Sequence, residues 1–132
     1  PGMAVLLIKG PDRRVVDFLH VWSVEPEELR VIRYNDEGFP IGGVRGSGTM
    51  LSGDELLVAV ESFTGNQPLI GLFDTEWNVE VIDDPGGTGP IVSVIDDIVF
   101  GLFRIVARRP GSVRLTGAAL NSETTIELEV LP

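Results

Sequence analysis

Apolar and polar residues alternate along most of this chain with a period of two residues. The alternation is clearest near the end of the sequence, where one face of a strand would carry Ile126, Leu128 and Val130 and the other Thr125, Glu127 and Glu129. The segment from Glu55 to Phe63 has the same period with less distinct faces. A period of two is typical of half-buried antiparallel strands, so the pattern predicts an all-β protein.

Further segments with strand character occur along the whole chain, giving about eight or nine strands in all. They are Ala4 to Lys9, Leu29 to Tyr34, Trp77 to Ile82, Ile91 to Ile95, Ile98 to Val106 and Val113 to Ala118. Turn residues separate them, at Gly10-Pro11-Asp12, Asn35 to Gly38, Gly65 to Pro68, Asp83 to Pro90 and Pro110-Gly111. Many short strands with regular turns predict an antiparallel sandwich or barrel.

The segment after Asp12 fits two descriptions. Val15, Phe18, Leu19 and Trp22 also fall at helical spacing behind a possible Asp12 cap, whereas the β-branched residues in this stretch favour a strand. No other segment supports a helix of ordinary length, and we therefore predict a strand here.

From residue 52 onward the order of these signals becomes specific. Ser52-Gly53-Asp54-Glu55 precedes an alternating strand, Gly65 to Leu69 follows it, and Trp77 begins the next strand. Near the end, Gly101 to Ala107 and Pro110 to Thr116 have the form of a hairpin, and Thr125 to Leu131 that of a closing strand. This arrangement resembles the bacterial immunoglobulin-like domain, group 2, a module of intimin- and invasin-type surface proteins.

The resemblance implies an immunoglobulin-like antiparallel β-sandwich of about seven to nine strands, in which Trp77 packs between the sheets and Pro110-Gly111 turns the chain before the penultimate strand. It covers about 80 residues, within 52–132, whereas residues 1–50 match only loosely around Val24-Glu25-Pro26 and Leu29. Those first residues would form extra edge strands or belong partly to a preceding domain. The resemblance also implies a non-catalytic structural or interaction module of a larger bacterial protein that is surface-exposed, secreted or periplasmic.

Composition sets outer bounds on this interpretation. The 132 residues suit a single domain, 1–132, and the chain contains no Cys, so its core does not depend on disulfides. A formal net charge of −10 disfavours nucleic acid and anionic membrane surfaces as partners. Apolar runs such as Met3 to Ile8 are too short to insert directly into a membrane as a helix. Since the chain begins Pro1-Gly2, we interpret it as a mature fragment with neighbouring domains.

Residues that could support catalysis are sparse, and we predict no catalytic, cofactor-binding or metal-ligating residue and no enzyme activity. His20 is the one histidine, and with Phe18, Trp22 and Val24 on its strand face it is interpreted as a packing or edge residue. Gly42 to Gly48 matches no phosphate-binding motif, and Gly46-Ser47-Gly48 is interpreted as a flexible loop. Glu27-Glu28 is a sequential pair whose members would point to opposite faces of a strand.

Two binding functions stay open as alternatives, in which the chain is an accessory domain of an extracellular enzyme. Asp83-Asp84 and Asp96-Asp97 lie near strand ends, where carboxylate oxygens could bind calcium. Trp22, Trp77, Tyr34 and the six Phe could form a carbohydrate platform, and Tyr34 and Phe39, which flank the acidic turn, would be the residues to test. A protein or a glycan is therefore the expected class of partner.

Overall fold

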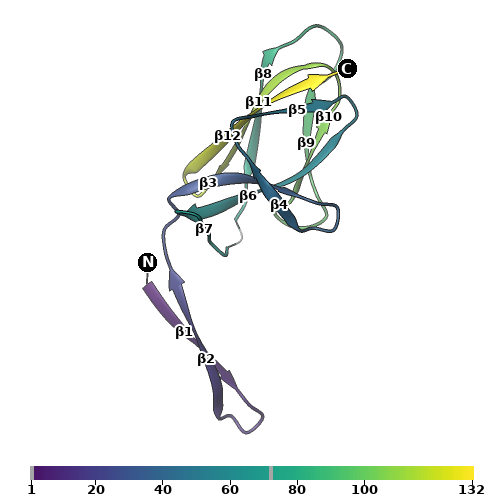
Figure 1. Ribbon diagram of the computed structural model, residues 1–132. Coiled ribbons are helices and arrows are strands. Elements are labelled where there is room, and N and C mark those ends of the chain that lie inside the picture. The colour runs from purple at the N-terminus through teal and green to yellow at the C-terminus, as the bar shows by residue number, and fades with distance from the viewer. Residues whose placement is uncertain (1, 72) are drawn as a thin grey trace.

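A computed structural model describes residues 2–71 and 73–132 (Figure 1). Within these residues every regular element is a strand. The strands are β1 (Gly2–Lys9), β2 (Val15–Ser23), β3 (Glu28–Tyr34), β4 (Pro40–Val44), β5 (Ser47–Leu51), β6 (Glu55–Thr64), β7 (Gln67–Pro68), β8 (Glu76–Asp83), β9 (Val92–Asp96), β10 (Phe103–Ala107), β11 (Gly111–Ala119) and β12 (Ser122–Leu131). The described part of the chain holds no helix of the length and hydropathy needed to span a bilayer.

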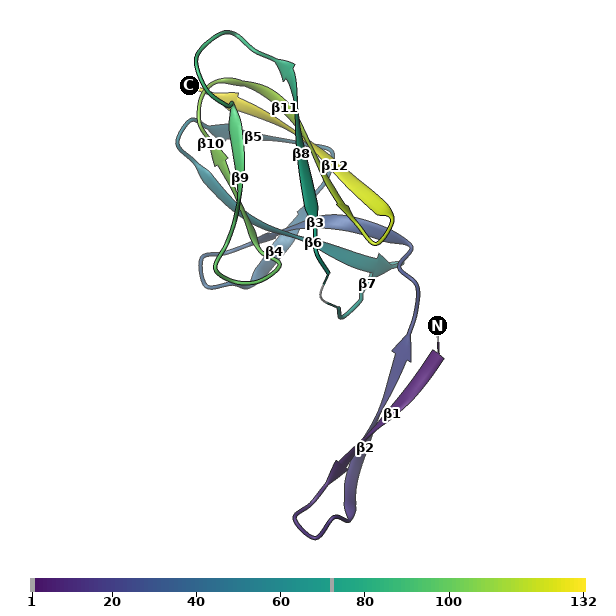
Figure 2. The same ribbon diagram turned by 180° about the vertical axis from the view of Figure 1, so that it is seen from behind.

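Ten of these strands, β3 to β12, form two sheets that pack face to face as a sandwich (Figures 1 and 2). The first sheet has the order β4-β3-β6-β10-β9, with the short β7 paired to β6. The second sheet has the order β5-β12-β11-β8. The chain crosses from the first sheet to the second between β4 and β5, at Gly46, which has a positive φ of 70°.

This strand order is that of the immunoglobulin fold. In the order of neighbouring strands, β3-β6-β10-β9 corresponds to the A-B-E-D sheet and β8-β11-β12 to the C-F-G sheet. All pairings among the described residues are antiparallel except that of β5 with β12, which is parallel. The predicted immunoglobulin-like β-sandwich is therefore confirmed, with three strands more than predicted because β4, β5 and β7 escaped the sequence pattern.

The core lies between the sheets and follows the alternation of the sequence. Along β11 the side chains alternate strictly between buried and partly exposed, and Val113 and Leu115 are fully buried. Ile126, Leu128 and Val130 of β12 are buried, as predicted, while Glu127 and Glu129 face solvent. A two-residue turn, Leu120-Asn121, joins these strands with positive φ at both residues, as in a type I′ hairpin. Burial of one face of each sheet stabilises the sandwich.

Trp77 of β8 packs between the sheets, as predicted. Its indole ring packs edge to face against the ring of Phe103 in the opposite sheet, and the ring centroids are 5.7 Å apart. Gly117 is its cross-strand partner in β11, and a Cβ atom there would lie 2.8 Å from Cγ2 of Val60 and 3.3 Å from the indole. Val60 and Gly117 lie on the B and F strands, which antibody domains join by a disulfide. In this chain the close approach of Val60 to Gly117, beside the indole, occupies the position of that disulfide.

Two segments differ from the sequence prediction. Residues 98–102 were expected to begin the strand that ends at Val106, but β10 begins only at Phe103. The preceding residues turn, because Oδ1 of Asp97 accepts a hydrogen bond from the Val99 amide at 3.2 Å and Gly101 has a φ of 84°. The interpretation of Gly46-Ser47-Gly48 as a flexible loop is wrong at its last two residues, which begin β5. A Cβ at Gly48 would lie 3.3 Å from Leu128, so glycine lets β5 approach β12 closely.

The remaining two strands, β1 and β2, form a separate hairpin that extends away from the sandwich (Figures 1 and 2). The predicted strand after Asp12 is confirmed as β2, and β1 covers the predicted Ala4 to Lys9 segment. Every described residue of both strands is exposed. The hairpin enters the sandwich through residues 24–27, at the end opposite to the C-terminus (Figure 1).

The two tryptophans allow a matched test of this architecture. Replacing Trp77 with Ala removes an aromatic ring from between the sheets, and we expect a loss of about 3 kcal/mol or more in the free energy of unfolding. Trp22, on the hairpin, is 69% exposed. Trp22→Ala should therefore change the free energy of unfolding by less than about 0.5 kcal/mol. Urea denaturation at submicromolar protein concentration compares the two variants, and equal losses would contradict the placement of Trp77.

Candidate functional site

The β1–β2 hairpin is the most unusual surface of the molecule, since both of its faces are apolar. Directly opposed residues of an antiparallel pair share a face, and the register pairs Met3 with Trp22, Val5 with His20 and Leu7 with Phe18. We call these six residues the aromatic face. The alternate pairs are Ala4 with Val21, Leu6 with Leu19, and Ile8 with Asp17, and we call these six the aliphatic face.

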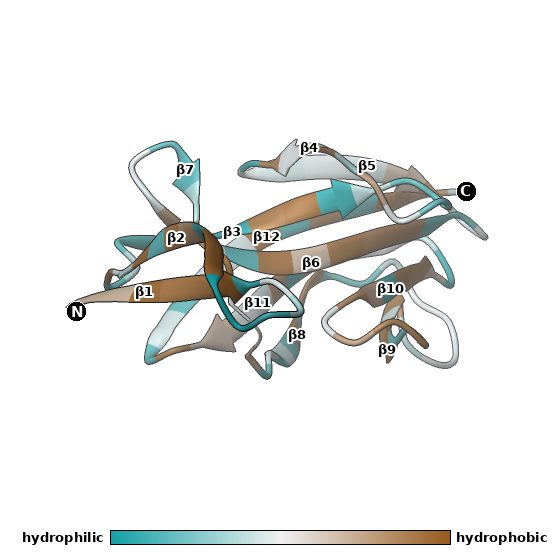
Figure 3. Cartoon of the chain, turned by 90° about the horizontal axis from the view of Figure 1, so that it is seen from below, coloured by the Kyte–Doolittle hydropathy of each residue, from teal (hydrophilic) through white to brown (hydrophobic). Residues whose placement is uncertain are grey.

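The large apolar side chains of both faces are about half exposed, and Phe18 and Leu19, on opposite faces, each have 57% of their surface in contact with solvent. Figure 3, viewed from below, shows the hairpin as an apolar ribbon. The β11–β12 hairpin of the same chain is built differently. Its outer face is polar, with Arg114 paired to Glu127 at 2.8 Å and to Glu80 at 3.1 Å. Strands that are apolar on both faces are typical of structures that cover both faces.

The sequence contained a signal for this surface that the strand prediction did not use. Met3 to Ile8 is an uninterrupted apolar run, whereas the strands of the sandwich that have one solvated face alternate. The run is too short for a membrane span and overlaps the strand predicted at Ala4 to Lys9. Its departure from alternation was the relevant feature, because it indicates a strand with no face intended for water.

His20 lies in the middle of the aromatic face. Its ring meets that of Phe18 edge to face, with centroids 5.4 Å apart, and Trp22 shares the face as predicted. The expected packing role is only partly met, because this face is exposed within the described chain. Val24 lies beyond the end of β2.

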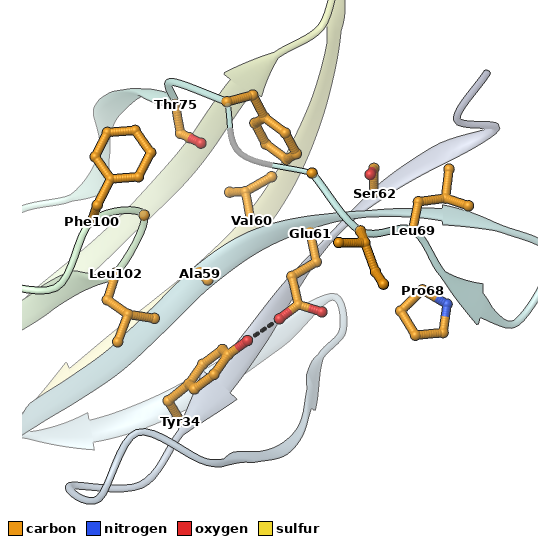
Figure 4. Close-up of a pocket in the computed structure, with 14 residues that line it drawn as sticks. Tyr34, Ala59, Val60, Glu61, Ser62, Pro68, Leu69, Thr75, Phe100 and Leu102 are labelled. Atoms are coloured by element: carbon orange, nitrogen blue, oxygen red, sulfur yellow. Dashed lines mark hydrogen bonds between the residues drawn. The ribbon is translucent and has the colours of Figure 1, made fainter. Parts of the chain in front are cut away.

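A shallow cleft of about 360 Å³ lies on the first sheet, lined by Tyr34 of β3, residues 59–62 of β6, residues 68–71, 73 and 75, and residues 100–102 (Figure 4). The hydroxyl of Tyr34 donates a hydrogen bond to the Glu61 carboxylate at its floor. Burial, the hydrogen bond to Glu61 and the negative charge of Glu61 together raise the pKa of Tyr34 to about 12, and burial contributes most. The protonated phenol joins β3 to β6 through this hydrogen bond and is not available as a base at neutral pH.

The aromatic residues considered for a carbohydrate platform are divided among the hairpin, the core, the cleft and a turn. Trp22 is on the hairpin, Trp77 is packed between the sheets and Tyr34 lines the cleft. Phe39 is exposed in the turn between β3 and β4, outside the cleft lining. These side chains do not form the single row that a sugar platform requires.

Asp84 and Arg109 join the long β8–β9 loop to the β10–β11 turn. The two guanidinium nitrogens donate to the two carboxylate oxygens at 2.6 and 2.8 Å, and Arg109 Nε donates to the Gly89 carbonyl at 2.9 Å. The Asp84 carboxylate also accepts a hydrogen bond from the Gly86 amide at 2.9 Å. The hydrogen bonds from Arg109, then from Gly86, lower the pKa of Asp84 to about 2. This carboxylate is a structural tie for the loop.

Asp97 has a similar role at the other end of β9. It accepts a hydrogen bond from the Val99 amide and pairs with Arg104 at 2.9 Å, and these contacts lower its pKa. Arg104 also pairs with Glu55 at 2.8 Å. Since β9 separates Asp84 from Asp97, the two acidic pairs do not share a site. Within residues 2–71 and 73–132, no three acidic, His or Cys side chains are grouped so as to hold a metal ion.

No family model matches the chain, and no curated protein matches it. Among solved structures, domains 4 and 5 of the S-layer protein SbsC align with 99% of this chain and 70% of their own length, at 16% identity and a TM-score of 0.42. The titin M3 domain aligns over 80% of this chain and 100% of its own, at 14% identity and a TM-score of 0.34. Likenesses this distant do not bear on function, and the fold class rests on the strand order described above.

The Asp84–Arg109 pair predicts a specific acid sensitivity. Because the folded-state pKa of Asp84 lies below its ordinary value of 3.8, the stabilisation is fully present above about pH 4 and is lost as the pH falls through about 2. Asp84→Asn removes this dependence, so stability should fall less steeply between pH 4 and pH 2 than in the unmodified protein. Urea titrations at several pH values measure the slope. Asp83→Asn is the control, and a slope changed equally by both substitutions would contradict the assignment.

A second prediction concerns calcium. Asp84 and Asp97 are each bound to an arginine, so binding calcium would require these ion pairs to break. Replacing a chelator with millimolar calcium should therefore change the melting temperature by less than about 1 °C. A larger rise, abolished by Asp84→Asn or Asp97→Asn, would restore the calcium-binding alternative.

Proposed function

We propose that this chain is a non-catalytic structural and interaction module, in which the sandwich is a rigid spacer and the β1–β2 hairpin is the contact element. The observation that carries the proposal is the exposure of apolar side chains on both faces of the hairpin. An isolated two-stranded hairpin is only marginally stable in water, and contiguous exposed apolar surface marks interaction sites. A partner that covers the hairpin would stabilise its two strands, and burial of the apolar side chains would contribute to the free energy of binding.

The shape of the molecule supports the spacer role. The hairpin and the C-terminus lie at opposite ends of the molecule, so the sandwich separates a partner bound by the hairpin from the C-terminus (Figure 1). The polar outer face of the second sheet, with its Arg114 ion pairs, suits a solvent-exposed spacer.

The proposed location of the module within a larger protein is based on the resemblance described at the outset. The order of strand and turn signals from Ser52 to Leu131 is similar to that of bacterial immunoglobulin-like domains of surface proteins. We therefore propose that the chain is part of a bacterial surface, secreted or periplasmic protein with neighbouring domains. A protein surface that is itself apolar is the class of partner that the hairpin fits best.

The non-catalytic part of the proposal is supported by where the reactive side chains lie. His20 belongs to β2 of the hairpin, which extends away from the sandwich (Figure 1). Asp84 and Asp97 are bound by arginines, and Tyr34 is held by Glu61. A general acid, a base and a nucleophile would have to converge on one site, and these groups do not.

Fluorescence quenching of Trp22 tests whether the hairpin is free to make contacts. In a Trp77→Phe variant, Trp22 is the one remaining indole, and acrylamide should quench it about as fully as a free tryptophan when the protein is dilute. In the matched Trp22→Phe variant, the remaining Trp77 should be shielded. Shielding of Trp22 at the lowest measurable concentration would show that the hairpin folds back on its own sandwich, and the proposal would fail.

A further inference from the structure

We propose that the aromatic face of the hairpin is a self-association surface, through which two copies of this chain pack face to face about a twofold axis. This inference rests on the proposed function, because it names the partner of the contact element. It commits the aromatic face to one occupant, the same face of a second copy. The axis would pass near Val5 and His20, the middle pair of that face.

The distribution of charge favours the hairpin as the place where two copies meet. Residues 2–23 contain Lys9, Arg13 and Arg14 against Asp12 and Asp17, a net charge of +1. The formal net charge of the whole chain is −10, so the residues outside the hairpin carry a net charge of −11. Two sandwiches repel one another, but the hairpin extends away from the sandwich and holds the negative bodies apart (Figure 2). Hairpin-to-hairpin packing brings apolar surfaces together without placing the acidic sandwiches in contact.

The choice of face follows from its side chains. The aromatic face carries no carboxylate, and the one ammonium group that strand alternation adds to it, that of Lys9, lies at the end of β1, whereas the aliphatic face includes Asp17 beside Ile8. Packing two aliphatic faces together would take that carboxylate out of water, which is unfavourable without a cationic partner. Phe18 and Trp22 are also large, stiff side chains of the kind that dominate the energetics of interfaces.

The available area is sufficient for a weak, specific dimer. The five large apolar side chains of the aromatic face, Met3, Val5, Leu7, Phe18 and Trp22, are between 45% and 69% exposed. Each offers on the order of 100 Å² for burial, which gives roughly 1,000 Å² for a pair of copies, the lower limit of specific interfaces. We therefore expect a dissociation constant on the order of micromolar.

Sedimentation equilibrium of the full chain tests the proposal, with protein from about 0.1 to 100 µM to bracket a micromolar constant. The unmodified protein should shift from monomer to dimer over this range. Because each copy carries the substitution, Phe18→Lys places two charges in the proposed interface and should raise the dissociation constant about 100-fold. Leu19→Lys is the matched control, because Leu19 is equally exposed on the opposite face, and it should change the constant less than about threefold. Equal effects of the two substitutions, or a monomer throughout, would overturn the proposal.

A cross-linking experiment locates the contact independently. The chain contains no cysteine, so a single introduced thiol can pair only between copies. Val5→Cys lies near the proposed axis and should form a disulfide-linked dimer on mild oxidation, because the two sulfur atoms meet there. Leu6→Cys, its neighbour on the aliphatic face, should cross-link far more slowly. Faster cross-linking of Leu6→Cys would assign the contact to the aliphatic face and overturn the inference.

Quenching of Trp22 separates failure of this inference from failure of the proposed function. In the Trp77→Phe variant, Trp22 should become shielded as the concentration rises through the dimer transition. A monomer whose Trp22 stays open to acrylamide at every concentration would exclude the second copy while leaving the hairpin as a contact surface for another partner. A monomer whose Trp22 is shielded at every concentration would remove both proposals.

Discussion

Contact between the inner faces of the two sheets is the constraint on which the rest of the sandwich depends. The indole of Trp77 reaches Phe103 across the interface, and Gly117 leaves room for it against Val60. Buried aliphatic residues of β11 and β12 continue this contact along the core. Because each sheet has one apolar face, neither is stable without the other, and the position of every loop follows from that pairing. The arginine ties of Asp84 and Asp97 then fix the loops on either side of β9.

The two long hairpins of this chain show how the same chemistry leads to different roles. In β11–β12 one face is buried and the other carries ion-paired polar side chains, so the hairpin is complete within the fold. In β1–β2 both faces are apolar and neither is covered by the described residues. The first hairpin stabilises the module, and the second has surface that is useful only in contact with something else. This difference is the physical basis for assigning binding to residues 2–23.

Most of the sandwich could be predicted from the sequence because alternation directly reports which face of a strand is buried. Residues 111–131 show this well, since Val113, Leu115, Ile126 and Leu128 lie where the period of two puts them. The Gly-rich segment misled the prediction, because Gly48 has no side chain to contribute to a pattern and its role is to admit a close neighbour. The apolar residues 98–102 resembled a strand, but Asp97 and Gly101 bend the chain there. The exposure of the hairpin could not be predicted from alternation, which reports faces but not whether a partner is within reach.

The parallel pairing of β5 with β12 has a mechanical consequence for a spacer. The two strands are in register from Ser47 with Glu127 to Leu51 with Leu131. Tension applied through the N-terminal hairpin first loads β3, which pairs with β6 and β4, and reaches the first residue of β5 once those two strands are released. Tension at the C-terminus pulls β12 from its last residue. Because the strands run in the same direction, these forces act in opposite senses along them. The hydrogen bonds between them are then loaded together in shear and not one at a time, so the last strand of the chain acts as a clamp that resists extension.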